Sequence, residues 1–235
     1  RLAALCTLFA LLLAGTAHAQ RQTLDDFSDL SAWTTATAPG VTAQLSSDDG
    51  ALRLDFDFGD GGGYAIARRD LSLTIPDHYR FSYRVRARSR TNDLEFKLID
   101  PSGENVWWHN RRQFAFPATW QTLTTRPRHV SFAWGPAQDR TLREVGSVEF
   151  VVAAVEGRKG TLWLDDFAFE KLPPPAPPQT PRVTASGGQV GGAVLDGVSG
   201  WAVQRGSHSL TLDFGDAREF GGVALESAAP GDARF

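Results

Sequence analysis

Two residue types that most chains carry are scarce here. Methionine is absent from the 235 residues, and cysteine occurs once, at Cys6. Because translation starts at a methionine, we expect the natural product to begin upstream of Arg1. The chain also stops at Phe235 without a pattern that closes a domain. We therefore expect the sequence to be a piece of a longer protein, with a possible catalytic domain after its C-terminal end.

Long apolar runs and an excess of positive charge are also missing. A membrane-spanning helix needs about 18 or more consecutive apolar residues, and no stretch after the N-terminal segment approaches that length. We therefore expect no transmembrane segment. The chain has 24 Lys and Arg against 27 Asp and Glu, a net charge of −3. Because binding to nucleic acid needs a cationic surplus that neutralises phosphates, we expect no nucleic-acid partner.

Residues 1–19 have the pattern of a secretory signal peptide. Arg1 gives a basic start, an apolar run follows at 2–14, and Ala17-His18-Ala19 places small residues at the cleavage site. A buried N-terminal helix is the alternative. Cleavage would remove Cys6, which excludes disulfides, thiolate metal sites and cysteine nucleophiles from the mature chain. The sequence thus predicts a secreted or periplasmic protein that depends on a packed core.

A run of prolines divides the mature chain. Six of them fall between Pro173 and Pro181 in a segment that cannot join a β-sheet, because proline lacks the ladder donor. Such a segment prefers an extended conformation and acts as a semi-rigid spacer. We therefore predict a first domain at 22–172, a linker at 173–181 and a second, incomplete domain at 182–235.

The first domain shows the two-residue period of β-strands. Apolar residues alternate with polar ones at 52–58, 80–88, 94–98, 148–152 and 162–169, and Gly/Asp/Ser/Pro turn clusters separate these runs. No window of eleven residues keeps a clean helical stripe. Many short strands with one apolar face predict two packed sheets. The predicted fold class is all-β, a β-sandwich jelly roll, followed by a truncated second β-sandwich.

Two acidic doublets open and close the first domain. Asp25-Asp26 and Asp165-Asp166 each stand between an apolar residue and a phenylalanine. If the first and last strands lie side by side, carboxylates from both doublets can converge, and oxygen ligands of this kind suit Ca²⁺. Solvated acids at strand ends are the alternative explanation. A glycosidase acid pair is a third, although it would need one carboxyl kept neutral in a cleft.

The segment from Asn105 to Arg112 is the part most typical of a ligand site. Adjacent residues of a strand point to opposite faces, so Trp107 and Trp108 cannot both join the core cleanly. An exposed indole can stack on a sugar ring while neighbouring polar groups bind hydroxyls. The predicted ligand-binding residues are Trp107, Trp108, His109, Asn110, Arg111 and Arg112. Alternatively, both rings cap the sandwich and the arginines cover them.

The ends of the first domain resemble those of bacterial carbohydrate-binding modules with the galactose-binding-like jelly-roll fold. The similarity rests on residues 24–33 (LDDFSDLSAW) and 160–167 (GTLWLDDF) and covers about 150 residues. Many of these modules carry a structural calcium between the two ends. The resemblance therefore implies Asp25 or Asp26, together with Asp165, as ligands of a structural Ca²⁺.

A second resemblance follows the linker. Residues 183–186 (VTAS), 193–197 (AVLDG), Trp201, 210–215 (LTLDFG) and 218–223 (REFGGV) are similar to the first half of a discoidin, or coagulation factor 5/8 type C, domain. The chain departs from that family in the short gap between Asp196 and Trp201 and in lacking the second half. Half a domain does not place the binding loops, so no ligand site is predicted here.

Together these features predict a non-catalytic region that binds a polysaccharide or oligosaccharide. Two binding domains behind a signal peptide resemble the front of a multimodular carbohydrate-active protein. Such a region would target a glycoside hydrolase to its polymer by raising its effective concentration there. A protein-binding, adhesive surface module is the main alternative, and a glycosidase fragment with its own acid pair is a third.

Overall fold

The computed structural model describes residues 20–175, 177, 180–186, 189–190, 201–202 and 206–215. Its strands are β1 (Gln20–Asp25), β2 (Trp33–Thr37), β3 (Thr42–Asp48), β4 (Ala51–Asp57), β5 (Tyr64–Thr74), β6 (Tyr79–Arg88), β7 (Asn92–Ile99), β8 (Val106–Phe114), β9 (Gln121–Thr125), β10 (Ser131–Trp134), β11 (Glu144–Ala153), β12 (Lys159–Lys171), β13 (Arg182–Ala185), β14 (Gln189–Val190), β15 (Trp201–Ala202) and β16 (Leu210–Asp213). One 3-10 turn, Pro127–His129, is the only helical element among the described residues. These residues include no helix long and apolar enough to cross a membrane.

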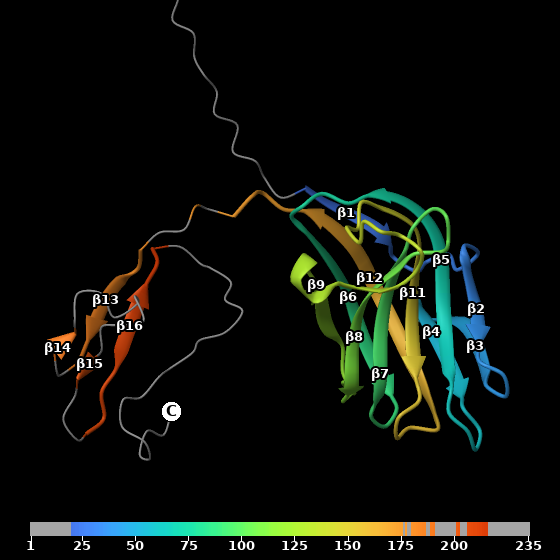
Figure 1. Ribbon diagram of the computed structural model, residues 1–235. Coiled ribbons are helices and arrows are strands. Elements are labelled where there is room, and N and C mark those ends of the chain that lie inside the picture. The colour runs from blue at the N-terminus through green and yellow to red at the C-terminus, as the bar shows by residue number, and fades with distance from the viewer. Residues whose placement is uncertain are drawn as a thin grey trace, which may run out of the picture. The chain divides into compact units, whose positions relative to one another are not determined.

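The strands up to β12 form two antiparallel sheets that pack as a sandwich (Figure 1). The first, called the β6 sheet below, has the order β3-β4-β12-β6-β9, with β1 also pairing with β12. The second, called the β7 sheet, has the order β10-β8-β7-β11-β5-β2. Neighbours in space are mostly not neighbours in sequence, because the chain passes repeatedly from one sheet to the other. The predicted all-β sandwich is therefore confirmed.

The two-residue period in the sequence decides which side chains enter the sandwich. Along β6, Phe81, Tyr83 and Val85 are at most 1% exposed, whereas Ser82 and Arg84 between them are partly exposed. The same alternation holds on β4, where Leu54 and Phe56 are buried. Each strand thus has one face toward the core and one outer face.

Aromatic rings join the two sheets at the centre. Phe81 and Phe167 come from the β6 sheet, and Phe96 and Phe150 come from the β7 sheet. Ring centroids are 5.3 Å apart for Phe81–Phe96 and for Phe150–Phe167, both edge-to-face. Fully buried aromatic rings contribute much of the hydrophobic stabilisation of a core. A chain without disulfides therefore has a core large enough to hold the sheets together.

The first and last strands of the sandwich lie side by side. β1 pairs with β12, and Asp25 is the register partner of Phe167. The chain separates into two compact units, Arg1–Pro174 and Pro175–Phe235. In the second unit β13 pairs with β16, and β14 pairs with β15. The predicted signal peptide and much of the predicted discoidin segment lie outside the described residues, so both stay predictions.

Candidate functional site

The residues predicted to bind a ligand alternate between the two sides of β8. Trp107 belongs to the core and is 5% exposed. Its indole N–H donates to the carbonyl of Arg140 at 2.7 Å, and its ring is edge-on to Phe132 at 5.3 Å. A ring enclosed in this way cannot stack on a ligand at the surface. The six residues therefore do not lie on one face of the strand, and their role in ligand binding stays a prediction.

Trp108 points to the outer face of the β7 sheet. It lies opposite Lys97 in the register of β7 and β8. Its ring is edge-on to Trp134 of β10, with centroids 5.7 Å apart. Trp134 is 47% exposed, which is high for so large an apolar side chain. The ring of Trp108, fixed by its position on β8, thus holds the exposed ring of Trp134 in a defined orientation.

Charged side chains lie beside these two rings. The ammonium of Lys97 is 5.2 Å from the centroid of the Trp134 ring, 3.1 Å from a carboxylate oxygen of Glu95 and 4.0 Å from one of Glu149. Glu95 is 8% exposed and Lys97 9%. Burying charges costs free energy unless they are paired, and here each has a partner of opposite sign. The pairing fixes the orientation of several hydrogen-bonding groups before any ligand arrives.

We call this surface the Trp134 face. It comprises Tyr64, Glu95, Lys97, Trp108, Trp134 and Glu149. The ring of Tyr64, which is 42% exposed, has its centroid 6.0 Å from the Lys97 ammonium. Two exposed aromatic rings therefore flank a row of paired charges on the outer side of one sheet.

The sequence alone identified only one member of this face. That member is Trp108. Trp134 stands before a Gly-Pro turn, where a tryptophan is often a packed structural residue, so the sequence did not mark it as a ligand contact. The alternation at 94–98 carries the missed signal, because it turns Glu95 and Lys97 to the same side. This local alternation could not show that β10 pairs with β8. That pairing brings Trp134 next to Trp108.

The remaining predicted residues divide between the same two sides. Asn110 lies opposite Glu95 and shares the outer side with Trp108, and Arg112 is exposed. His109 points inward, with Nδ1 2.9 Å from the hydroxyl of Thr125. Arg111 donates to the carbonyl of Thr124 at 2.8 Å.

His109 is held in an uncharged state inside the sandwich. Its ring stacks on His129 at 4.8 Å. Burial lowers the pKa of His109 to about 3, and the nearby positive charge of Arg111 and the His129 ring act in the same direction. Both His109 and Arg111 bond to β9 of the other sheet, so their contacts close one edge of the sandwich.

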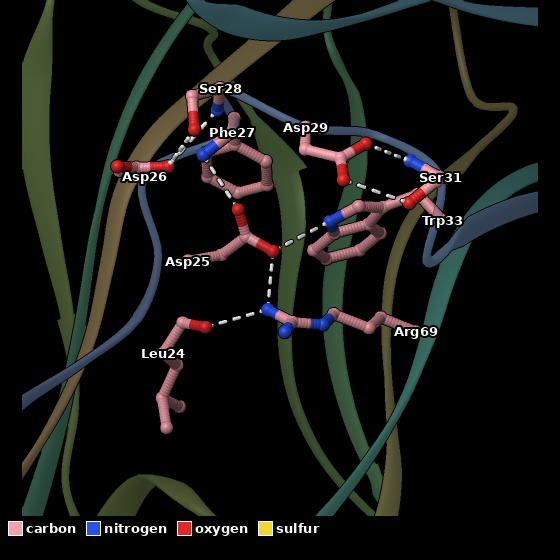
Figure 2. Close-up of polar contacts among 9 residues, drawn as sticks. All are labelled: Leu24, Asp25, Asp26, Phe27, Ser28, Asp29, Ser31, Trp33 and Arg69. Atoms are coloured by element: carbon pink, nitrogen blue, oxygen red, sulfur yellow. Dashed lines mark hydrogen bonds and ion pairs between the residues drawn. The ribbon is translucent and has the colours of Figure 1, made fainter.

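The acidic residue Asp25 is occupied by hydrogen-bond donors (Figure 2). Its carboxylate accepts from the backbone N–H of Phe27 at 2.6 Å, from the indole N–H of Trp33 at 2.9 Å and from the guanidinium of Arg69. Its side chain is 7% exposed. Since Arg69 belongs to β5 of the β7 sheet, Asp25 points between the sheets and ties the N-terminal strand to the far sheet.

The other acidic residues near Asp25, which are Asp26 and Asp29, accept hydrogen bonds from serines of the same loop. The hydroxyl and backbone N–H of Ser28 donate to Asp26, which lowers the pKa of that carboxyl. Ser31 donates to Asp29 in the same way (Figure 2). These contacts order the loop that leads from β1 to Trp33.

The second acidic doublet, Asp165-Asp166, points away from Asp25 and pairs with other arginines. Asp165 pairs with Arg84 at 3.0 Å on the outer face of the β6 sheet, and Asp166 pairs with Arg21 at 2.7 Å. Asp25 and Asp165 thus lie on opposite faces of this sheet. The described residues contain no group of three or more His, Cys, Asp or Glu side chains that could hold a metal. In this arrangement the predicted ligands do not fit one Ca²⁺ ion, and calcium binding stays an untested prediction.

Comparison with known proteins relates the chain to carbohydrate-binding modules by fold. No protein-family model and no curated protein matches it. The solved family 11 carbohydrate-binding module of a cellulosomal cellulase of Clostridium thermocellum has 14% identity and a TM-score of 0.52, and covers 65% of this chain and 95% of its own. The family 11 module from Clostridium thermocellum in complex with a β-1,3-1,4-mixed-linked tetrasaccharide has 16% identity and a TM-score of 0.51, covering 63% and 94%. At these identities the likeness shows a shared jelly-roll fold.

Proposed function

We propose that the first unit is a non-catalytic module that binds a polysaccharide or oligosaccharide on the Trp134 face. The observation that carries this proposal is the exposed Trp134, held edge-on by Trp108 beside the paired charges of Lys97. The shared fold with carbohydrate-binding modules supports the same function, although a fold hosts many functions.

The face has the two parts that recognition of a sugar requires. The flat, apolar side of a pyranose packs on an indole, and the hydroxyl groups around the ring need donors and acceptors. Lys97 supplies donors, and Glu95 and Glu149 supply acceptors within the same cluster. Because the ion pairs fix these groups in advance, binding loses little side-chain entropy.

The same geometry does not favour hydrolysis. A glycosidase needs one carboxylic acid that is kept protonated opposite a second carboxylate. Glu95 pairs with Lys97, and Glu149 pairs with both Lys97 and Arg68, so each carboxylate serves as the partner of a cation. This arrangement suits binding of hydroxyl groups.

We further infer that the unit targets an exported multimodular protein to its polymer. The Pro-rich segment after β12 would act as a semi-rigid spacer between binding units. A tethered module raises the effective concentration of any linked catalytic domain near the polysaccharide. The predicted signal peptide would place the protein outside the cytoplasm, where such polymers occur.

Retention on a panel of immobilised neutral polysaccharides tests the binding function, with mixed-linked β-1,3-1,4-glucan as one member. We expect Trp134→Ala to weaken retention about fivefold or more, because loss of one stacked aromatic contact costs about 1–3 kcal/mol. Val155→Ala is the matched control, since Val155 is also 47% exposed. Equal retention of the wild type and Trp134→Ala on every polymer would contradict the proposal, and capture of a protein without any glycan retention would favour an adhesive module.

A further inference from the structure

The outer face of the β6 sheet carries arginines stacked on tryptophans. Arg86 of β6 lies opposite Trp163 of β12 in the strand register, with its guanidinium 4.8 Å from the centroid of that ring. The same guanidinium is 4.8 Å from the ring of Trp120, which immediately precedes β9. Arg88, the next outward residue of β6, lies 5.7 Å from the Trp163 ring. Arg84 also lies over Trp120, at 4.9 Å, and Arg53 over Trp163, at 5.6 Å, so two indoles support four arginines.

The charges on this face are not evenly paired. Arg53, Arg80 and Arg84 each form an ion pair with an Asp or Glu side chain. For Arg86 and Arg88, the part of the chain that the structure describes contains no carboxylate partner. The Nε of Arg86 is buried and lacks a hydrogen-bond partner among the described residues. Since that Nε–H is enclosed, the hydrogen-bonding capacity left for a ligand lies in the terminal N–H groups of Arg86 and Arg88.

Stacking on an indole leaves the N–H edge of a guanidinium available for a ligand. The indole contacts the flat face of the group, while its N–H donors lie along the edge. That edge matches the two oxygens of a carboxylate, the geometry in which arginine binds most strongly. Outward residues two apart on one strand are separated by roughly 7 Å, so Arg86 and Arg88 can receive separate anionic groups.

We propose that Arg86, Arg88, Trp120 and Trp163, called here the Arg–Trp site, bind an acidic polysaccharide through the carboxylates of its uronic acid residues. Charge complementarity selects an anionic sugar, and the rings of Trp120 and the buried Trp163 hold the two guanidinium groups in place for its carboxylates. The attraction is local, because the chain as a whole carries a net charge of −3. This site is separate from the Trp134 face, since the two occupy the outer sides of different sheets.

The first test measures retention of the whole protein on immobilised polygalacturonate. We expect the double variant Arg86→Gln/Arg88→Gln to bind about tenfold more weakly, as loss of two exposed charge contacts predicts. Arg143→Gln/Arg158→Gln is the matched control, because it removes the same charge from two exposed arginines elsewhere. An equal loss in the control, or no retention of the wild type on this polymer, would overturn the proposal.

Wild-type protein supplies a second test that does not depend on a variant folding. In an NMR titration with oligogalacturonate, we expect the indole N–H signal of the partly exposed Trp120 to shift, with little change for neutral dextran oligomers. Equal shifts with polyglutamate would show a general anion surface, and a response to a sulfated glycan alone would show another ligand; either result would overturn the uronate assignment. Because Trp134→Ala should leave this shift intact, failure of this site and failure of the Trp134 face are distinguishable.

Discussion

At the scale of single residues, Asp25 connects the beginning of the first unit to the far sheet. Three donors converge on one carboxylate whose side chain is 7% exposed. Among them, Arg69 keeps a buried charge satisfied, and the indole N–H of Trp33 has its only described partner here. An acidic motif typical of metal ligands thus stabilises the fold through hydrogen bonds.

Asp25→Asn should therefore destabilise the protein. The change leaves the guanidinium of Arg69 without its negative partner, and loss of such a partner costs about 2–3 kcal/mol. Urea denaturation measures the effect as a lower midpoint. Asp26→Asn, at the exposed neighbouring position, is the control and should cost less than about 1 kcal/mol. Equal midpoints for wild type and Asp25→Asn would contradict this account of the motif.

The same contacts bear on the calcium prediction. Since Asp25 and Asp165 lie on opposite faces of the β6 sheet and each pairs with an arginine, we expect EDTA to leave the melting temperature unchanged. A clear fall in melting temperature with EDTA, restored by Ca²⁺, would show that the acidic doublets hold an ion after all.

His109 should make stability depend on pH. Its pKa is about 3 in the folded protein, against an ordinary value of 6.5. Between these values the unfolded chain binds a proton that the folded one does not, so the stabilisation is complete above pH 6.5 and is lost as the pH falls toward 3. Melting at pH 4.5 and 7.0 should show a smaller difference in His109→Gln than in the wild type. An unchanged difference would assign the pH dependence to other groups.

At the scale of elements, the turn after β10 fixes the position of Trp134. Gly135 has φ +138°, and a Cβ there would lie 2.4 Å from the side-chain oxygen of Asn105. That oxygen accepts from the backbone N–H of Ala137 at 2.8 Å, and the amide nitrogen of Asn105 donates to Asp100. One glycine therefore allows the close packing that holds the end of β10.

Gly135→Ala should accordingly displace β10 and weaken glycan retention. We expect a loss of stability of about 1–3 kcal/mol from the clash and the unfavourable φ. Calorimetry measures the stability, and retention on the polysaccharide panel measures the function. Gly103→Ala is a suitable control, because Gly103 has φ +79° but open space around its Cβ position. Similar losses of retention in both variants would argue against a specific role for this turn.

The strands themselves were largely predictable from the sequence, while their neighbours were not. The alternation at 80–88 and 94–98 follows from local patterning, so it assigned the inward Phe81 and Phe96 correctly. Pairing of β8 with β10 depends on the path of the chain between the sheets, which no local pattern encodes. For that reason Trp108 was found and its partner Trp134 was not.

At the scale of the whole molecule, the first unit presents two different outer faces. The β7 sheet carries exposed aromatic rings beside paired charges, and the β6 sheet carries arginines stacked on indoles. On this account a neutral glycan and an acidic one bind to separate surfaces of one sandwich. A module of this kind, joined to others by a Pro-rich segment, would recognise a composite polysaccharide through more than one contact.

The measurement that tests the central claim most directly is an NMR titration of the protein with a neutral mixed-linked gluco-oligosaccharide. It follows the indole N–H signals of the tryptophans, which report each ring separately. The account predicts saturable shifts for Trp134 and Trp108, with little change for the enclosed Trp33 and Trp107. Binding that leaves Trp134 and Trp108 unshifted while other indoles respond would contradict it.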